Sequence, residues 1–149
     1  MEECRILVLN GPNLNLLGTR DPEHYGLETL DSIVDRLKER ASVRGAVITH
    51  FQSNHEGELI EALHEAAGWA DGIIINPAAY THYSYAIRDA LQAAGLPAVE
   101  VHLSDISDRE PWRRESVTED LCISQISGKK GEGYLEALDL LLDHLAELS

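Results

Sequence analysis

The chain has 149 residues, a length typical of one domain with its own hydrophobic core. It contains 12 Lys and Arg against 26 Asp and Glu, which gives a formal net charge of −14. Nucleic acids and anionic membranes attract basic surfaces, so this composition argues against both as partners. Its apolar runs are shorter than the roughly 20 residues of a membrane helix, and strand-like sequence begins too early for a signal peptide. With Cys4 and Cys122 alone, we expect a cytoplasmic protein with two reduced thiols.

Five strand-like segments alternate with four helix-like segments along the chain. The expected strands are residues 6–10, 46–52, 72–76, 98–103 and 121–127, and the expected helices are residues 27–43, 56–70, 83–94 and 133–148. The first helix has an apolar stripe from Leu30 to Ala41 and a charged face that we expect to be solvated. Asn54 is expected to cap the second helix, and Gly95 ends the third. The segment 104–120 is long and polar, with one short helical turn expected at most.

This alternation predicts one three-layer α/β domain over residues 1–149, because consecutive parallel strands need right-handed helical crossovers. The third strand contains an uninterrupted run of isoleucines, which must be covered on both faces. Five parallel strands in a chain of this length indicate a flavodoxin-like sandwich with the strand order 2-1-3-4-5. Cys4 and Cys122 fall on the first and fifth strands, which are not neighbours in that order.

Ligands of open parallel sheets bind at the carboxyl ends of the strands, and polar residues collect there in this chain. The first strand is followed by Asn13, Arg20 and Tyr25, and the second by Ser53, Asn54 and His55. The third ends at Asn76, with Tyr80, Thr81 and His82 after it, and the fourth ends with Glu100, His102 and Ser104, with Arg109, Arg113 and Arg114 beyond. The connections at the opposite edge look structural. We therefore expect a functional site at the carboxyl edge of the sheet.

The loop after the first strand, residues 10–26, has an unusual composition. It contains three asparagines, two prolines, three glycines, one arginine and one tyrosine, without helical periodicity. Amide donors, fixed turns and a cation beside a phenol are typical of a preorganised site. A tight turn without further function explains Asn10-Gly11-Pro12-Asn13 equally well.

Glu100 and His102 occupy alternate positions of the fourth strand and therefore share one face. A glutamate beside a histidine can fix its tautomer and increase its basicity, so we favour a functional role for His102. His82 could have only a structural role as a helix cap, and Asn76 could end its strand without any role in binding or catalysis. The sequence shows no zinc-binding spacing, residues 128–133 lack Walker spacing, and the first loop is not a flavin phosphate loop.

Four ordered motifs closely resemble the type II 3-dehydroquinate dehydratases, or type II dehydroquinases. The motifs are Asn10-Gly-Pro-Asn-Leu-Asn-Leu-Leu-Gly18 with Arg20 and Tyr25-Gly26; Phe51-Gln-Ser-Asn-His-Glu-Gly57; Ile75-Asn-Pro-Ala-Ala-Tyr-Thr-His82 with Arg88-Asp89-Ala90-Leu91; and Pro97-Ala-Val-Glu-Val-His-Leu-Ser104. The resemblance spans residues 5–142, nearly the whole chain. Pro111-Trp112 stands where the family usually has an acidic residue and an aromatic one.

The resemblance implies loss of water from 3-dehydroquinate to give 3-dehydroshikimate, by anti elimination through an enolate. It implies no metal, no cofactor and no imine. In this chain Tyr25 would be the base, with Arg20 favouring its ionised form, and His102 the acid, oriented by Glu100. Asn13 would hold the enolate oxygen through a water molecule. A free tyrosine has a pKa of about 10, so a phenolate near neutrality requires about 4 kcal/mol of stabilisation, which a nearby guanidinium can supply.

The resemblance also implies a set of substrate contacts. The amides of Leu103 and Ser104, the Ser104 hydroxyl and Asn76 would receive the substrate carboxylate, and Arg113 and His82 would hold ring hydroxyls. Asp89 would reach into the site of a neighbouring subunit, since the family forms trimers that assemble into homododecamers. The alternatives are a catalytically silent small-molecule binding module on the same scaffold and a flavodoxin-like nucleotide or flavin binder.

Overall fold

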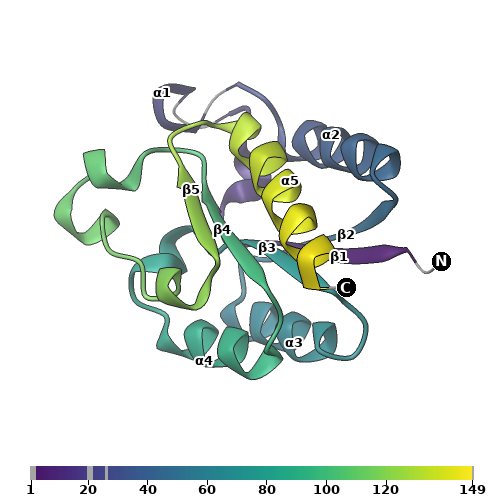
Figure 1. Cartoon of the computed structure of the whole chain (residues 1–149). Helices are drawn as coiled ribbons and strands as arrows, with labels where there is room; N and C mark the ends of the chain where they lie inside the picture. The colour runs from purple at the N-terminus through teal and green to yellow at the C-terminus, as the bar shows by residue number, and fades with distance from the viewer. Residues whose placement is uncertain (1–2, 20–21, 26, 149) are drawn as a thin grey trace.

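Five parallel strands form the centre of the molecule in the order β2-β1-β3-β4-β5, as predicted (Figure 1). The computed structural model describes residues 3–19, 22–25 and 27–148. The strands are β1 (Cys4–Asn10), β2 (Ala46–Gln52), β3 (Gly72–Asn76), β4 (Ala98–His102) and β5 (Ser124–Ser127). The parallel register brings the carboxyl ends of β1, β3 and β4 together, which positions the site described below.

Helices cover both faces of the sheet (Figure 1). Helices α2 (Leu30–Val43) and α5 (Gly131–Leu148) pack on one face, and α3 (Glu56–Ala66) and α4 (Tyr85–Ala94) pack on the other. The isoleucines of β3 explain this division, because Ile74 points into the first layer while Ile73 and Ile75 point into the second. All three are at most 1% exposed, as a strand covered on both faces requires.

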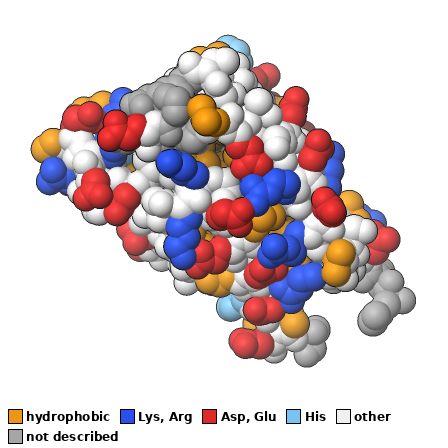
Figure 2. Space-filling model, turned by 90° about the horizontal axis from the view of Figure 1, so that it is seen from above, with side chains coloured by type: hydrophobic (Ala, Val, Ile, Leu, Met, Phe, Trp, Pro, Cys, Tyr) orange, Lys and Arg blue, Asp and Glu red, His pale blue; other side chains and the backbone are white. Residues whose placement is uncertain are grey.

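The outer face of α2 is charged and solvated, as predicted, and α5 continues the charged face. Figure 2 shows basic and acidic side chains interleaved across this face. Ion pairs join the two helices, among them Arg40 with Asp139 at 2.6 Å and Arg44 with Asp143 at 2.7 Å. Such exposed pairs contribute little stability, so the buried stripe of α2 is what fixes its position. Among the described helices, none combines the length and apolarity that crossing a membrane needs.

Three helix starts differ from prediction, and in two of them a side chain caps the observed start. Helix α2 begins at Leu30 rather than at residue 27, since the Thr29 hydroxyl accepts the amide of Ser32. Helix α4 begins at Tyr85 rather than at residue 83, since the Ser84 hydroxyl accepts the amide of Ile87. Helix α5 begins two residues earlier than predicted, at Gly131. The loop after β1 also contains a short helix that was not predicted, α1 (Pro22–Tyr25).

The predictions for Asn54 and Cys122 were wrong. His55 occupies the N-cap position of α3, and Asn54 Oδ1 instead accepts the backbone amide of Asn13 at 2.9 Å. The fifth strand is shorter than predicted because a 3₁₀ turn, η5 (Glu119–Leu121), occupies its expected beginning. Cys122 follows that turn and does not lie on β5.

The polar segment after β4 contains more local structure than expected. In addition to η5 it forms two further 3₁₀ turns, η3 (Ile106–Asp108) and η4 (Pro111–Arg113). Pro111 begins the second of these, where its fixed φ angle is suited to a helical start. These turns place two arginines, Arg109 and Arg113, beside the carboxyl edge of the sheet.

Candidate active site

A cavity opens at the carboxyl ends of β1, β3 and β4. Most of the predicted site residues line it: Asn13, Tyr25, Asn76, His82, His102, Leu103, Ser104 and Arg113. Glu100 is fully buried directly behind His102, and Asp89 lies on the exposed side of α4, outside this lining. Arg20 lies outside the described residues. Arg109 also lines the cavity, although no role was assigned to it in the sequence analysis.

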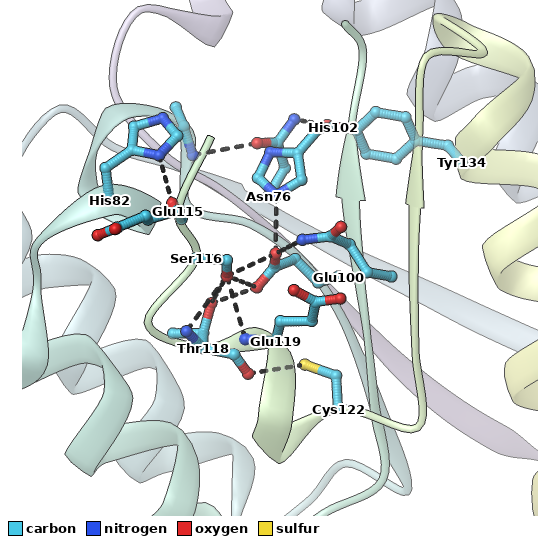
Figure 3. A network of polar contacts seen from close by, with 12 residues as sticks. Asn76, His82, Glu100, His102, Glu115, Ser116, Thr118, Glu119, Cys122 and Tyr134 are labelled. Carbon is cyan, nitrogen blue, oxygen red and sulfur yellow. Dashed lines mark hydrogen bonds and ion pairs between the residues drawn. The ribbon is translucent and has the colours of Figure 1, made fainter. Parts of the chain in front are cut away.

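His102 and Glu100 form a buried pair on β4, as their alternate positions predict (Figure 3). Nε2 of His102 lies 2.8 Å from Oε2 of Glu100, and the two side chains are 6% and 0% exposed. Burial alone would raise the pKa of Glu100, but hydrogen bonds from His102, Thr118 and Gln125 outweigh it and hold the pKa below its ordinary value. An ionised carboxylate only accepts hydrogen bonds, so His102 carries a proton on Nε2.

The phenol of Tyr25 lies against two guanidinium groups. Its oxygen is 3.3 Å from both Nη1 and Nη2 of Arg109 and 3.2 Å from Nη1 of Arg113. The Arg109 guanidinium carbon also lies 5.5 Å from the centre of the Tyr25 ring. Cations at this distance favour the ionised form of a phenol. The site therefore provides a positive environment for Tyr25 within a strongly acidic chain.

Two loops hold Asn13 in a left-handed conformation at the mouth of the cavity. Its φ angle is +69°, a region that asparagine tolerates better than most residues. The side chain of Asn54 accepts its amide, and the amide of Leu16 donates to its carbonyl at 3.0 Å. Asn54 therefore supports the loop after β1 from the loop after β2.

Tyr134 of α5 orients Asn76 through its hydroxyl group. Asn76 Nδ2 donates to the Tyr134 hydroxyl at 2.9 Å, and Asn76 Oδ1 accepts the amide of Ala78 at 3.0 Å. The Tyr134 hydroxyl in turn donates to Asn10 Oδ1 at 2.6 Å. Complete burial raises the pKa of Tyr134, so it stays a neutral donor. The carboxamide of Asn76 is thus fixed in one orientation.

His82 and Arg113 are held at the other side of the cavity. Nδ1 of His82 lies 2.6 Å from the carbonyl oxygen of Glu115, and burial lowers the pKa of His82. The ring of Trp112 meets the His82 ring edge-on, with centroids 5.7 Å apart. The Arg113 guanidinium lies 4.3 Å above the Trp112 ring, and its Nε is 2.7 Å from a carboxylate oxygen of Glu110. Trp112 thus gives Arg113 an aromatic support.

The chain matches the family model described as "Dehydroquinase class II" over residues 4–142. A 3-dehydroquinate dehydratase of Laribacter hongkongensis is 55% identical over 145 residues, which cover 97% of this chain and 94% of that protein. A 3-dehydroquinate dehydratase of Vibrio vulnificus is 52% identical over 143 residues, 96% of each. The crystal structure of a type II dehydroquinase from Butyrivibrio crossotus has a TM-score of 0.91 and 46% identity, and covers 93% of this chain and 97% of that one.

The chain belongs to the class II dehydroquinase family. All four motifs that suggested this family contribute residues to the site or to its support. Asn13, His82 and His102 come from the first, third and fourth motifs and line the cavity. The second motif contributes Asn54, which acts on the backbone of Asn13.

Two contacts of this dehydroquinase site were not found by sequence reasoning, although Arg109 itself was placed at the carboxyl edge of the sheet. Arg109 and Tyr134 contact Tyr25 and Asn76 across more than fifty positions of the chain, which no local pattern reveals. A usable signal for Arg109 was its position, since it precedes a proline-initiated turn just after the strand that carries His102. Among the described residues, no group of three or more His, Cys, Asp or Glu side chains could hold a metal ion.

Proposed function

We propose that this chain is a type II 3-dehydroquinate dehydratase that converts 3-dehydroquinate to 3-dehydroshikimate by anti elimination of water through an enolate. The proposal rests on one observation: two groups of side chains suited to acid–base chemistry lie at the same cavity. One is the Tyr25 phenol beside the guanidinium groups of Arg109 and Arg113, and the other is the buried His102–Glu100 pair. A base and an acid at separate positions of one cavity suit an elimination that needs both.

Tyr25 is the proposed base, which takes the proton from the carbon beside the ketone. A phenol can do this near neutrality only if its anion is stabilised, and the contacts with Arg109 and Arg113 supply positive charge at the phenolic oxygen. Arg20 was predicted to supply this charge, and its role remains a prediction. Arg109 adds a cation whose contact with the phenol is observed.

His102 is the proposed acid, which donates its proton to the departing hydroxyl group. Its Nε2 faces Glu100, so the other ring nitrogen, Nδ1, is the one that serves the substrate. An ionised Glu100 stabilises the protonated imidazole and fixes its orientation. Asn13 would steady the enolate oxygen through a water molecule, from the mouth of the same cavity.

The substrate contacts follow from the family resemblance and from the positions of the lining residues. Leu103, Ser104 and Asn76 would receive the substrate carboxylate, while Arg113 and His82 would hold ring hydroxyls. Asp89 is exposed on α4 of this protomer, where it would serve a neighbouring subunit in a trimer or dodecamer. No cofactor is needed for this reaction, and the same step would serve shikimate formation or quinate breakdown.

An absorbance assay for the conjugated enone product tests the proposal. The purified wild type should produce this absorbance from 3-dehydroquinate, and Tyr25→Phe should abolish it while the protein keeps its fold and oligomer size. Tyr83→Phe is the matched control, because Tyr83 is 58% exposed and lies outside the cavity lining. A wild type that binds 3-dehydroquinate without turnover would instead support the silent binding module, and substantial turnover by Tyr25→Phe would refute the assigned base.

A further inference from the structure

A short connection between η4 and η5, residues 115–118, contacts His82 directly and contacts Glu100, the partner of His102 (Figure 3). We call this segment the strap. The carbonyl oxygen of Glu115 lies 2.6 Å from His82 Nδ1, and the hydroxyl groups of Ser116 and Thr118 reach Glu100 behind His102. The strap is not part of the cavity lining, so it acts on the site through the residues that it holds.

Glu100 accepts hydrogen bonds from four side chains at once. The Ser116 hydroxyl lies 3.0 Å and 2.8 Å from its two oxygens, and the Thr118 hydroxyl donates to Oε1. Gln125, which pairs with Glu100 in the β4–β5 register, donates from Nε2 to Oε2 at 2.6 Å. With His102, these donors surround both oxygens of a carboxylate that is 0% exposed.

The strap is itself fixed by its neighbours, so its hydroxyl groups have little freedom. The amide of Val117 donates to the carbonyl of Thr81 at 2.8 Å, and Arg88 donates to the carbonyl of Val117 at 2.8 Å. Ser116 Oγ accepts the amides of Thr118 and Glu119, at 3.3 Å and 3.1 Å. Because its lone pairs are used in this way, the Ser116 hydroxyl hydrogen is directed to Glu100.

These contacts decide where the protons of both histidines are found. A backbone carbonyl and an ionised carboxylate only accept, so His82 carries its proton on Nδ1 and His102 carries one on Nε2. The cavity is left with Nε2 of His82 and Nδ1 of His102. A neutral His82 then accepts a hydrogen bond from a hydroxyl group, whereas a protonated His102 donates one.

We propose that Ser116, Thr118 and Gln125 are positioning residues for the elimination, which keep Glu100 ionised and aimed so that His102 holds a transferable proton at Nδ1. This inference rests on the proposed function of His102 as the acid. Charge in a fully buried carboxylate is costly unless hydrogen bonds compensate it, and three neutral donors provide that compensation here. Without them Glu100 would protonate more readily and would no longer hold the imidazole.

The test compares Thr118→Val, Thr118→Ser and the wild type in the enone assay. Valine keeps the shape of threonine but removes the hydroxyl donor, so we expect kcat to fall by about tenfold to a hundredfold while KM changes by less than about threefold. Serine keeps the donor and should restore most of kcat. Thr49→Val is the matched control, because Thr49 is exposed on β2 and distant from Glu100 in the sheet order. Circular dichroism and gel filtration check that each variant keeps its fold and assembly.

A double-mutant cycle separates positioning from loop packing. Thr118→Val should cost little further kcat in a Glu100→Gln background, because the carboxylate that it serves is already gone. Equal losses in both backgrounds, or wild-type kcat in Thr118→Val, would overturn the inference. If Thr118→Val does not give folded protein, Gln125→Met on the neighbouring strand is measured by the same criteria. A wild type without turnover would refute the proposed function itself, whereas normal wild-type turnover with an unaffected Thr118→Val refutes only the role of the strap.

Discussion

Replacing Arg109 by methionine tests the electrostatic basis of the proposed chemistry. Arg109 contacts the Tyr25 oxygen through both of its terminal nitrogens, and Nη1 also donates to the Ser104 hydroxyl at 3.0 Å. Methionine fills a similar length of side chain without the charge. The substitution therefore removes a cation from the proposed base while it leaves His102 and Glu100 untouched.

The expected loss follows from the distance between the two groups. At the observed 3.3 Å, a full positive and a full negative charge attract by about 5 kcal/mol at an effective dielectric constant of about 20, and by about 1.3 kcal/mol in water. Tyr25 and Arg109 are both half-buried, and Arg113 remains beside the phenol, so we expect a net loss of about 2–3 kcal/mol. This corresponds to a fall of roughly 30- to 150-fold in kcat/KM near neutral pH.

The assay is the pH dependence of enone formation. Loss of the cation makes the phenol harder to ionise, so the acidic limb of the kcat/KM profile should move to higher pH by about 1.5 to 2 units. Arg109→Lys keeps the charge and should lie between the wild type and Arg109→Met. Arg40→Met, which removes an arginine from the outer face of α2, is the control for net charge. An Arg109→Met profile that coincides with that of the wild type would show that this guanidinium does not activate the base.

Three further predictions concern the support of the site. Tyr134→Phe leaves Nδ2 of the buried Asn76 without its acceptor and Oδ1 of Asn10 without the Tyr134 donor. It should lower the free energy of unfolding by about 1–3 kcal/mol in a denaturant titration; a loss below about 0.5 kcal/mol would contradict its role. The pKa of Glu100 is lowered in the folded state, so the stability that it contributes is present above the ordinary glutamate pKa of about 4.3 and is lost as the pH falls through the folded value. The wild type should therefore lose more stability than Glu100→Gln over that acidic range, and parallel pH curves would refute this. Trp112→Ala removes the aromatic support of Arg113 and should raise KM by about threefold to tenfold with a smaller effect on kcat, and an unchanged KM would count against that support.

The layers of the fold could be predicted because local patterns determine them. The isoleucine run of β3 and the apolar stripe of α2 each report burial directly, and strict alternation of strands and helices leaves few topologies. The placement of His102 beside Glu100 followed from strand periodicity alone. The rule that ligands bind at the carboxyl ends of parallel strands placed eight of the predicted site residues at the cavity, whereas Asp89 lies outside its lining.

Features that depend on distant partners could not be predicted. The predicted start of β5 at residue 121 was wrong because the 3₁₀ turn η5 occupies residues 119–121. The hydroxyl of Ser116, which precedes this turn, accepts the amide of Glu119. Asn54 was expected to cap a helix, but a backbone amide from another loop competes for its side chain. The contact of Arg109 with Tyr25 joins residues that are far apart in the chain, and it depends on the turns that follow β4.

Arg109 and Arg113 both contact Tyr25, but the proposed function assigns a direct contact with the substrate to Arg113 alone. Arg113 contacts the phenol through Nη1 alone, and the proposed function also asks it to hold a ring hydroxyl. Arg109 contacts the phenol through two nitrogens and is tied to Ser104, which receives the substrate carboxylate in the same proposal. A substrate that engages Arg113 would weaken its contact with the phenol and leave Arg109 as the main observed cation at the base. In this proposal, binding of the substrate carboxylate and ionisation of Tyr25 would be linked through one guanidinium, and that link would account for two arginines at this edge of the sheet in a chain with a net charge of −14.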